Sequence, residues 1–238
     1  MSTTTNKQRA FQQLFNAVAR NTKANGPQSR PVLEQFLYAI CREGVTRELA
    51  ERAFRSLNEH YFDWNEVRVS SPRELAESMD CLPDAEGRGQ RIIDFLQEVF
   101  ETTFSFDLES LQKKGMKQAA KQLSRYQAAN DYVINSVVQQ SLGGHAIPLD
   151  NASLRVLGRL GIYESETEDA EALRASLEHQ VPKIKGAAFC DTLSAIAYDF
   201  CVEDEPRCSA CPLCQHCPTG QEAKTMVPAS ANHRTKPR

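Results

Sequence analysis

Residues 201–217, CVEDEPRCSACPLCQHC, contain five of the eight cysteines in this chain. Cys201, Cys208, Cys211 and Cys217 follow the spacing C-x6-C-x2-C-x5-C. Four thiolates in so short a loop can converge on a [4Fe-4S] cubane. Structural zinc sites also use four thiolates, but they usually pair two C-x2-C knuckles across a longer loop. The spacing therefore favours an iron–sulfur cluster, with zinc or unligated thiols as the alternatives.

The fifth thiol of this stretch, Cys214, allows a second ligand set. Together with Cys208, Cys211 and Cys217 it gives C-x2-C-x2-C-x2-C, which approaches the run found in bacterial ferredoxins. That run has a wider last gap, although Pro218 after the final cysteine does fit it. We predict the ligand set that includes Cys201 and expect a cluster to survive loss of the Cys214 thiol.

The rest of the composition indicates a reduced protein outside the membrane. The N-terminal MSTTTNKQRAFQQ is polar, and no apolar stretch approaches the roughly 20 residues that a membrane helix needs. We therefore expect a cytoplasmic protein, in which clustered cysteines more often bind metal than form disulfides. The formal net charge is −3, so a nucleic acid would have to bind at a local basic patch.

Apolar residues recur at helical spacing through almost the whole chain. The i, i+3, i+4, i+7 stripe runs from Leu33 to Ile40, and similar stripes occupy 92–100 and 189–200. The segment 71–74, Ser-Pro-Arg-Glu, is a capping box. Sustained strand alternation is missing from the sequence. The sequence predicts an all-α fold of about ten helices, followed by a disordered tail over 218–238.

The cysteine loop and a second segment together resemble one known family. The endonuclease III branch of the helix-hairpin-helix DNA glycosylases has a C-x6-C-x2-C-x5-C loop after a helix near the C-terminus. It also has a G-x-x-x-x-x-V-D segment that leads into a helix with Arg-Val in its first turn. In LGGHAIPLDNASLRVLGRLG, Gly143, Asp150 and Arg155 with Val156 match that segment, with Leu149 in place of the valine.

The resemblance covers roughly residues 30 to 217 and implies two helical domains. One would span 32–145 and end in the hairpin region, and the other would combine 1–31 with 146–217 and carry the [4Fe-4S] cluster. In the family a flipped base enters a pocket between the domains. Asp150 would be the catalytic carboxylate, which stabilises positive charge on the sugar or orients water. An aspartate at this position also fits an ordinary helix N-cap, and the two roles are compatible.

The hairpin differs from the family pattern. The motif L-P-G-V-G-x-K falls without gaps on YQAANDYVINSVV, where Ala128 and Asn130 replace the glycines. Tyr132 stands at the position of the family's catalytic lysine, so no Schiff base and no lyase activity are expected. Lys117 offers a second possible hairpin, but it would place fifteen further residues between the lysine and Asp150. We therefore do not assign Lys117 as the nucleophile.

Charged residues favour and oppose DNA binding at different places. A basic stripe at i, i+4 spacing precedes the hairpin and would lie beside the DNA groove; it consists of Lys113, Lys117, Lys121 and Arg125. Ala128 and Asn130 would contact the DNA backbone at the hairpin. By contrast, 203–205 is Glu-Asp-Glu, where relatives carry basic residues.

Two functional hypotheses follow from these residues. The first is a monomeric DNA N-glycosylase of endonuclease III type, without lyase activity, that acts on duplex DNA with a damaged or mismatched base. The alternative is a catalytically inactive iron–sulfur module on the same fold that binds DNA or another protein. Asp150 and the cysteine loop favour the first; the acidic loop, the missing lysine and the glycine-free hairpin favour the second.

Overall fold

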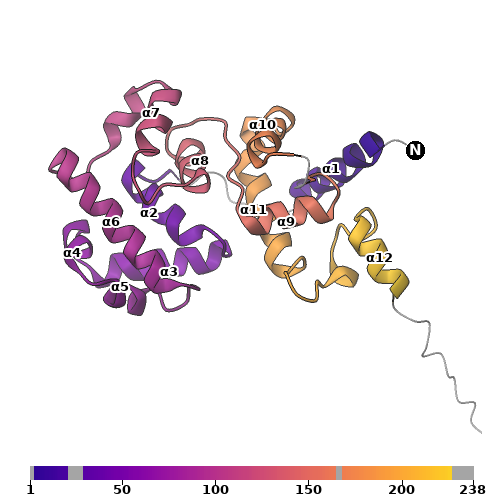
Figure 1. Cartoon of the computed structure of the whole chain (residues 1–238), viewed down its shortest axis with the longest axis horizontal. Coiled ribbons are helices and arrows are strands. Elements are labelled where there is room, and N and C mark those ends of the chain that lie inside the picture. Colours follow the sequence, from indigo (N-terminus) through magenta and orange to yellow (C-terminus); the bar gives the residue numbers. More distant parts are fainter. Residues whose placement is uncertain (1–2, 21–28, 165–167, 227–238) are drawn as a thin grey trace, which may run out of the picture.

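The computed structural model describes residues 3–20, 29–164 and 168–226. Within these ranges the chain forms twelve α-helices and three short 3-10 helices and no strand, so the prediction of an all-α fold is confirmed. The helices form two groups that lie side by side (Figure 1). None of the helices in the described part of the chain combines the length and apolar character needed to cross a bilayer.

The first group contains seven α-helices, most of which begin at a side-chain cap. Thr46, Asp63, Ser71 and Asn130 each accept a backbone N–H three residues further on, which satisfies one of the free donors at a helix start. Ser71 forms the predicted capping box with Glu74. The helices are α2 (Val32–Arg42), α3 (Arg47–His60), α4 (Trp64–Val69), α5 (Pro72–Ser78), α6 (Ala85–Thr103), α7 (Met116–Leu123) and α8 (Asp131–Gln140), with the 3-10 helix η1 (Glu109–Lys113) before α7.

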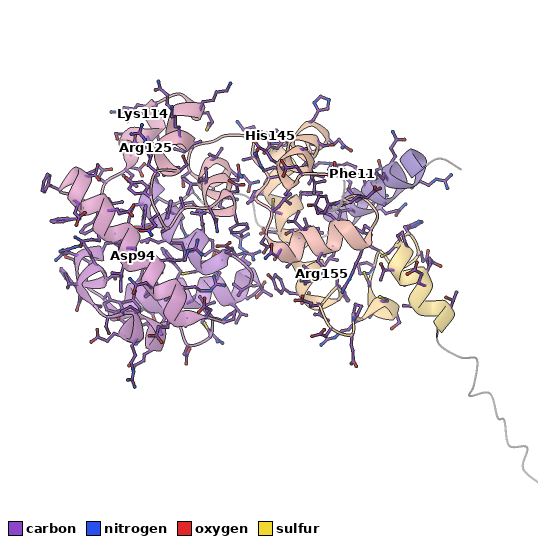
Figure 2. All side chains as sticks on the ribbon, in the orientation of Figure 1. Phe11, Asp94, Lys114, Arg125, His145 and Arg155 are labelled. Carbon is purple, nitrogen blue, oxygen red and sulfur yellow. The ribbon has the colours of Figure 1, made fainter. Side chains whose placement is uncertain are left out.

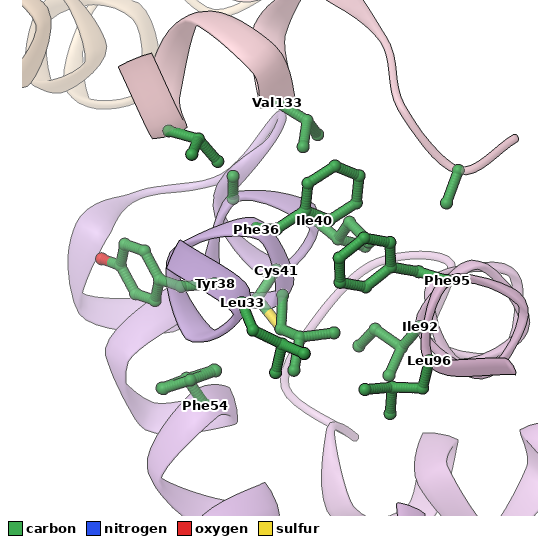
Figure 3. Close-up of a cluster of buried hydrophobic side chains, with 14 of the residues drawn as sticks. Leu33, Phe36, Tyr38, Ile40, Cys41, Phe54, Ile92, Phe95, Leu96 and Val133 are labelled. Carbon is green, nitrogen blue, oxygen red and sulfur yellow. The ribbon is translucent and has the colours of Figure 1, made fainter. Parts of the chain in front are cut away.

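Aromatic packing between α2 and α6 forms the centre of this group (Figure 3). The rings of Phe36 and Phe95 stack with their centroids 3.7 Å apart, and Tyr126 meets Phe95 edge-on at 5.0 Å. The predicted stripe from Leu33 to Ile40 is buried against this cluster. Burial of these apolar faces fixes α2, and therefore the polar residues that α2 carries, relative to α8.

The second group has its own hydrophobic cluster, in which Leu14, Leu157 and Phe189 are fully buried. The N-terminal helix returns to pack on α11, so both ends of the described chain belong to this group (Figure 1). Buried residues of the first cluster come from 32–137, and those of the second come from 10–14 and 147–213. The helices of the second group are α1 (Thr3–Arg20), α9 (Asn151–Arg159), α10 (Ala170–Gln180), α11 (Gly186–Asp199) and α12 (Pro218–Met226), with η2 (Lys183–Lys185) and η3 (Cys208–Ala210).

Helix α12 corrects the predicted tail. We predicted disorder from residue 218, but nine residues, Pro218–Met226, form a helix. Proline suits the first position of a helix because its φ is already helical. The helix is held to the cysteine loop, since Gln221 Nε2 donates to the Cys214 carbonyl at 2.8 Å. The prediction for 227–238 lies outside the described residues.

Candidate functional site

Asp150 lies immediately before α9, where the chain enters the second helix group. Its Oδ1 accepts hydrogen bonds from the Ser153 backbone N–H at 2.8 Å and the Ser153 hydroxyl at 2.6 Å. Its Oδ2 accepts from the Gly44 N–H at 3.2 Å and the Tyr198 hydroxyl at 3.4 Å. A carboxylate has about four lone-pair positions. Donors from three separate segments therefore fix the orientation of the Asp150 carboxylate.

The turn after α2 places the Gly44 N–H at this carboxylate. Gly44 has φ +72°, a left-handed conformation that glycine adopts without steric penalty. The Arg88 guanidinium donates to the carbonyls of Ile40 and Glu43 and so satisfies the end of α2. This arrangement holds the first helix group against Asp150 of the second.

Asp150 and Tyr132 line two cavities and form a wall that the cavities share. The outer groove has a volume of about 610 Å³ and includes Gly44, Asn130 and Tyr198. The inner cavity has a volume of about 60 Å³. Its polar side chains include Gln35 and Arg42 of α2, Ser136 and Gln139 of α8, and Asp191 and Ser194 of α11.

One of the arginines that line the inner cavity is buried. Arg42 is 9% exposed and donates to the Ser194 hydroxyl at 2.8 Å and to the Val45 carbonyl. Burial, the largest influence, lowers its pKa, but the surrounding phenols and carboxylates together raise that pKa above the ordinary value. Asp191 pairs with Arg47 at 2.6 Å. Burial raises the pKa of the Asp191 carboxyl despite the two arginines.

Neither Tyr132 nor the nearby thiol is set up as a nucleophile. Burial, the largest cause, raises the pKa of the Tyr132 phenol far above its ordinary value. Burial likewise raises the pKa of the Cys190 thiol to about 12. Both groups are therefore protonated at neutral pH, whereas the nucleophilic forms are the deprotonated thiolate and phenolate.

The predicted hairpin position is a turn between α7 and α8 whose polar groups are paired within the protein. The Gln127 N–H donates to the Glu98 carboxylate at 3.1 and 3.3 Å. Ala128 is buried, and its carbonyl accepts from Arg91 at 3.0 Å. Asn130 caps α8 by accepting the Val133 N–H at 2.9 Å, and its Nδ2 donates to the Glu43 carboxylate at 2.7 Å. The Glu98 carboxylate of the protein itself thus pairs with a backbone N–H of this turn.

The predicted basic stripe does not form on one helix. Lys113 ends η1, and Gly115 is the N-cap of α7, so only Lys117 and Lys121 share a helix face. A single helical period through 113–125 was wrong because Gly115 starts a new helix. All four basic residues of the stripe are exposed, and none lines the inner cavity or the outer groove. Lys114 and Arg125 lie at the same end of the first group, beside α7 (Figure 2).

The outer groove carries more acidic than basic side chains. Its charged lining residues are Glu43, Asp131, Asp150, Glu203 and Arg155. Among the described lining residues Arg155 is the single cation, and it donates through Nε to the Cys201 carbonyl at 2.9 Å. A surplus of carboxylates along a groove opposes the approach of a DNA backbone.

The cysteine loop packs against α9. Arg159 Nη1 lies 3.6 Å from the Cys201 sulfur, and the Arg159 carbonyl accepts from the Cys217 thiol at 3.1 Å. Burial is the main cause that raises the pKa of Cys208, Cys211 and Cys217, and the Cys201 thiol adds to it at all three. The donor types fit a four-thiolate cluster. In the described part of the chain, however, no three His, Cys, Asp or Glu side chains are close enough to hold a metal ion.

Three contributors to the site were not predicted from the sequence. Gly44 has a detectable signal, since glycine commonly follows the last residue of a helix. Gln35 also has a sequence signal, because it is a polar residue inside the apolar stripe of α2. No sequence signal indicates Tyr198, because it lies in an ordinary helix and reaches Asp150 only through the fold.

Solved DNA glycosylases share this arrangement of helices. A non-covalent endonuclease III–DNA complex has TM-score 0.70 and 17% identity, covering 92% of this chain and 98% of that one. A thermostable thymine-DNA glycosylase has TM-score 0.64 and 15% identity, covering 93% and 100%. The H. pylori 3-methyladenine DNA glycosylase has TM-score 0.58 and 13% identity, covering 82% and 97%. No family model and no curated protein matches the sequence. The chain therefore has the fold of the helix-hairpin-helix DNA glycosylases.

Proposed function

We propose that this protein is a DNA N-glycosylase that removes a damaged or mismatched base from duplex DNA without cleaving the strand. The position of Asp150 carries the proposal. Its carboxylate is fixed by four hydrogen bonds in the wall that the outer groove shares with the inner cavity. A nucleotide in the groove would thus have its sugar beside a carboxylate and its base directed to the inner cavity.

The Asp150 carboxylate would act on the charge that develops in the sugar. The bond between C1′ and the base nitrogen breaks, and its electron pair leaves with the base. Water forms the new bond to C1′, and the proton that it loses passes to the departing base. The negative charge of Asp150 stabilises the cationic sugar between these events. Since four donors already surround the carboxylate, electrostatic stabilisation fits it better than proton transfer.

The absence of an amine supports base removal without strand cleavage. By the family resemblance Tyr132 stands at the position of the lysine, and a phenol cannot form a Schiff base. Among the described residues that line the groove or the inner cavity there is no lysine. Hydrolysis by water is the route that these side chains leave open.

A [4Fe-4S] cluster held by Cys201, Cys208, Cys211 and Cys217 is part of the proposal. Its support is the ligand spacing and the packing of the loop against α9, where Arg159 Nη1 lies 3.6 Å from the Cys201 sulfur. Bound iron would supply the positive charge that gathered thiolates require. The loop would then hold α9, and with it Asp150, through the Arg159 guanidinium, which lies 3.6 Å from the Cys201 sulfur and donates to the Val202 carbonyl at 2.6 Å.

An inactive DNA-binding or protein-interaction module is the second candidate. The acidic groove and the Glu98 carboxylate at the hairpin turn favour it, because both oppose contact of a phosphate backbone with the groove that holds Asp150. The exposed lysines of α7 leave a separate surface on which nucleic acid could bind.

A lesion panel separates the two candidates. Excess protein is incubated with short duplexes that each contain one damaged or mismatched base, and the products are analysed before and after hot alkali. A glycosylase without lyase activity gives strand breaks only after alkali, and borohydride traps no covalent adduct. Binding without any released base would support the inactive module. An adduct with borohydride would show that an amine of this chain reaches the sugar.

A further inference from the structure

Gln35 is a buried polar residue on the inward face of α2. Its side chain is 2% exposed and lines the inner cavity, whereas its neighbours Leu33, Phe36 and Leu37 belong to the hydrophobic cluster. Its Oε1 accepts no hydrogen bond from any residue that the structure describes. A buried acceptor left unpaired shifts a folding equilibrium by about 5- to 150-fold against the folded state. Packing alone would favour an apolar residue at this position.

Three other polar side chains of the inner cavity, Gln139, Arg42 and Arg47, are paired within the protein. Gln139 Nε2 donates to the Ala146 carbonyl at 2.6 Å, and Arg42 donates to the Ser194 hydroxyl at 2.8 Å. Arg47 is bonded to Asp191 at 2.6 Å. These donors are directed to partners within the protein, so they do not satisfy Gln35. The Gln35 amide oxygen is therefore an acceptor available to a molecule in the cavity.

The inner cavity has the size of a small heterocycle. Its volume of about 60 Å³ corresponds to about four to six water molecules, since one water needs about 10–15 Å³ by this measure. Asp150 and Tyr132 line both this space and the outer groove, so a base that moved from the groove to Gln35 would pass beside the carboxylate.

We propose that Gln35 reads the extrahelical base by accepting a hydrogen bond from one of its N–H groups. This inference rests on the proposed function and adds the class of ligand: a nucleobase that presents a ring or exocyclic N–H donor to the wall formed by α2. A site built to pair with a donor strongly rejects an analogue that lacks it, because the buried acceptor then stays unpaired.

The test compares duplexes that differ by one N–H donor. One pair carries uracil or N3-methyluracil, and the other carries adenine or purine, each opposite guanine and each on a 2′-fluorinated sugar that resists excision. A duplex with a tetrahydrofuran abasic analogue reports binding that needs no base. Affinities are measured by fluorescence anisotropy for wild type and for two variants that remove the amide, Gln35→Leu and the unbranched Gln35→Met. The control is Gln90→Leu, which changes an exposed glutamine of α6.

Wild type and Gln90→Leu are expected to prefer the N–H member of at least one pair by about tenfold or more. Gln35→Leu and Gln35→Met should lose that preference and still bind the tetrahydrofuran duplex like wild type. Without DNA, both should also melt at a higher temperature, because an unpaired buried acceptor has been removed.

Two results overturn the inference alone: both Gln35 variants keep the preference, or wild type binds the tetrahydrofuran duplex but shows no preference within either pair. Lower melting temperatures for both variants would also count against it, since they would mean that Gln35 is satisfied within the folded protein. Folded wild type that binds none of the duplexes overturns the proposed function together with this inference.

Discussion

Replacing Gly44 by alanine is expected to destabilise the protein and to disturb Asp150. Gly44 has φ +72°, where an L-residue is strained. The added Cβ would meet only ordinary contacts, at 3.7 Å from Arg88 Nη2 and 4.0 Å from the Tyr198 hydroxyl. The loss therefore comes from the backbone and not from a clash.

The expected loss is about 1–2 kcal/mol, the penalty of a left-handed conformation for a residue with a Cβ. In a chain of this size each kcal/mol lowers the melting temperature by roughly 2–4 °C, so a fall of roughly 2–8 °C is predicted. Relief of the strain by rotation would also turn the Gly44 N–H away from the Asp150 Oδ2, now 3.2 Å away. Base release should therefore fall in Gly44→Ala more than stability alone explains.

Two other glycines provide matched controls for this experiment, which combines thermal unfolding with a base-release assay. Gly143 has φ +63° and open space around a new Cβ, so Gly143→Ala should lose similar stability and keep its activity. Gly115 has φ −59° and also has open space, so Gly115→Ala adds no backbone strain; it should keep its activity and lose only the stability that alanine costs at the N-cap of α7. Unchanged melting of Gly44→Ala would refute the assignment of strain to Gly44.

Three further changes test other parts of the site. Asn130→Ala removes the cap of α8 and the bond to Glu43, so urea unfolding should show a loss of about 1–2 kcal/mol, and an unchanged midpoint would contradict the cap. Cys211→Ser should abolish visible iron–sulfur absorption while Cys214→Ser keeps it; stoichiometric zinc without iron in wild type would exclude the cluster. Removing the side chains of Lys117 and Lys121 together should weaken binding to all duplexes alike and flatten the salt dependence by about one unit per lost contact. An unchanged salt slope would mean that α7 does not contact DNA.

The elements that were predicted well are those fixed by local chemistry. The Ser71 capping box and the apolar stripes of α2 and α6 follow from residues within one or two turns of each other. The N-cap role of Asp150 was equally local, and the structure shows its bond to the Ser153 N–H. The catalytic role of Asp150 stays a prediction, since it came from the family resemblance.

The elements that were missed depend on long-range packing or on the interruption of helical structure at Gly115. The bond from Gly44 to Asp150 joins residues 106 positions apart, so no local pattern indicates it. Helix α12 has little apolar periodicity and gains its contacts from the cysteine loop, which the sequence of 218–226 does not reveal. The basic stripe failed because regular spacing continued across Gly115 although the helix did not.

The most direct test of the central claim compares Asp150→Asn with Asp131→Asn in single-turnover base release. Both aspartates line the outer groove, and asparagine keeps the N-cap that Asp150 provides. The proposal predicts that wild type and Asp131→Asn release the same base, whereas Asp150→Asn binds the duplex equally well but is slower by about 100- to 1,000-fold. Equal rates for the two variants, or no base released by folded wild type across the lesion panel, would contradict it.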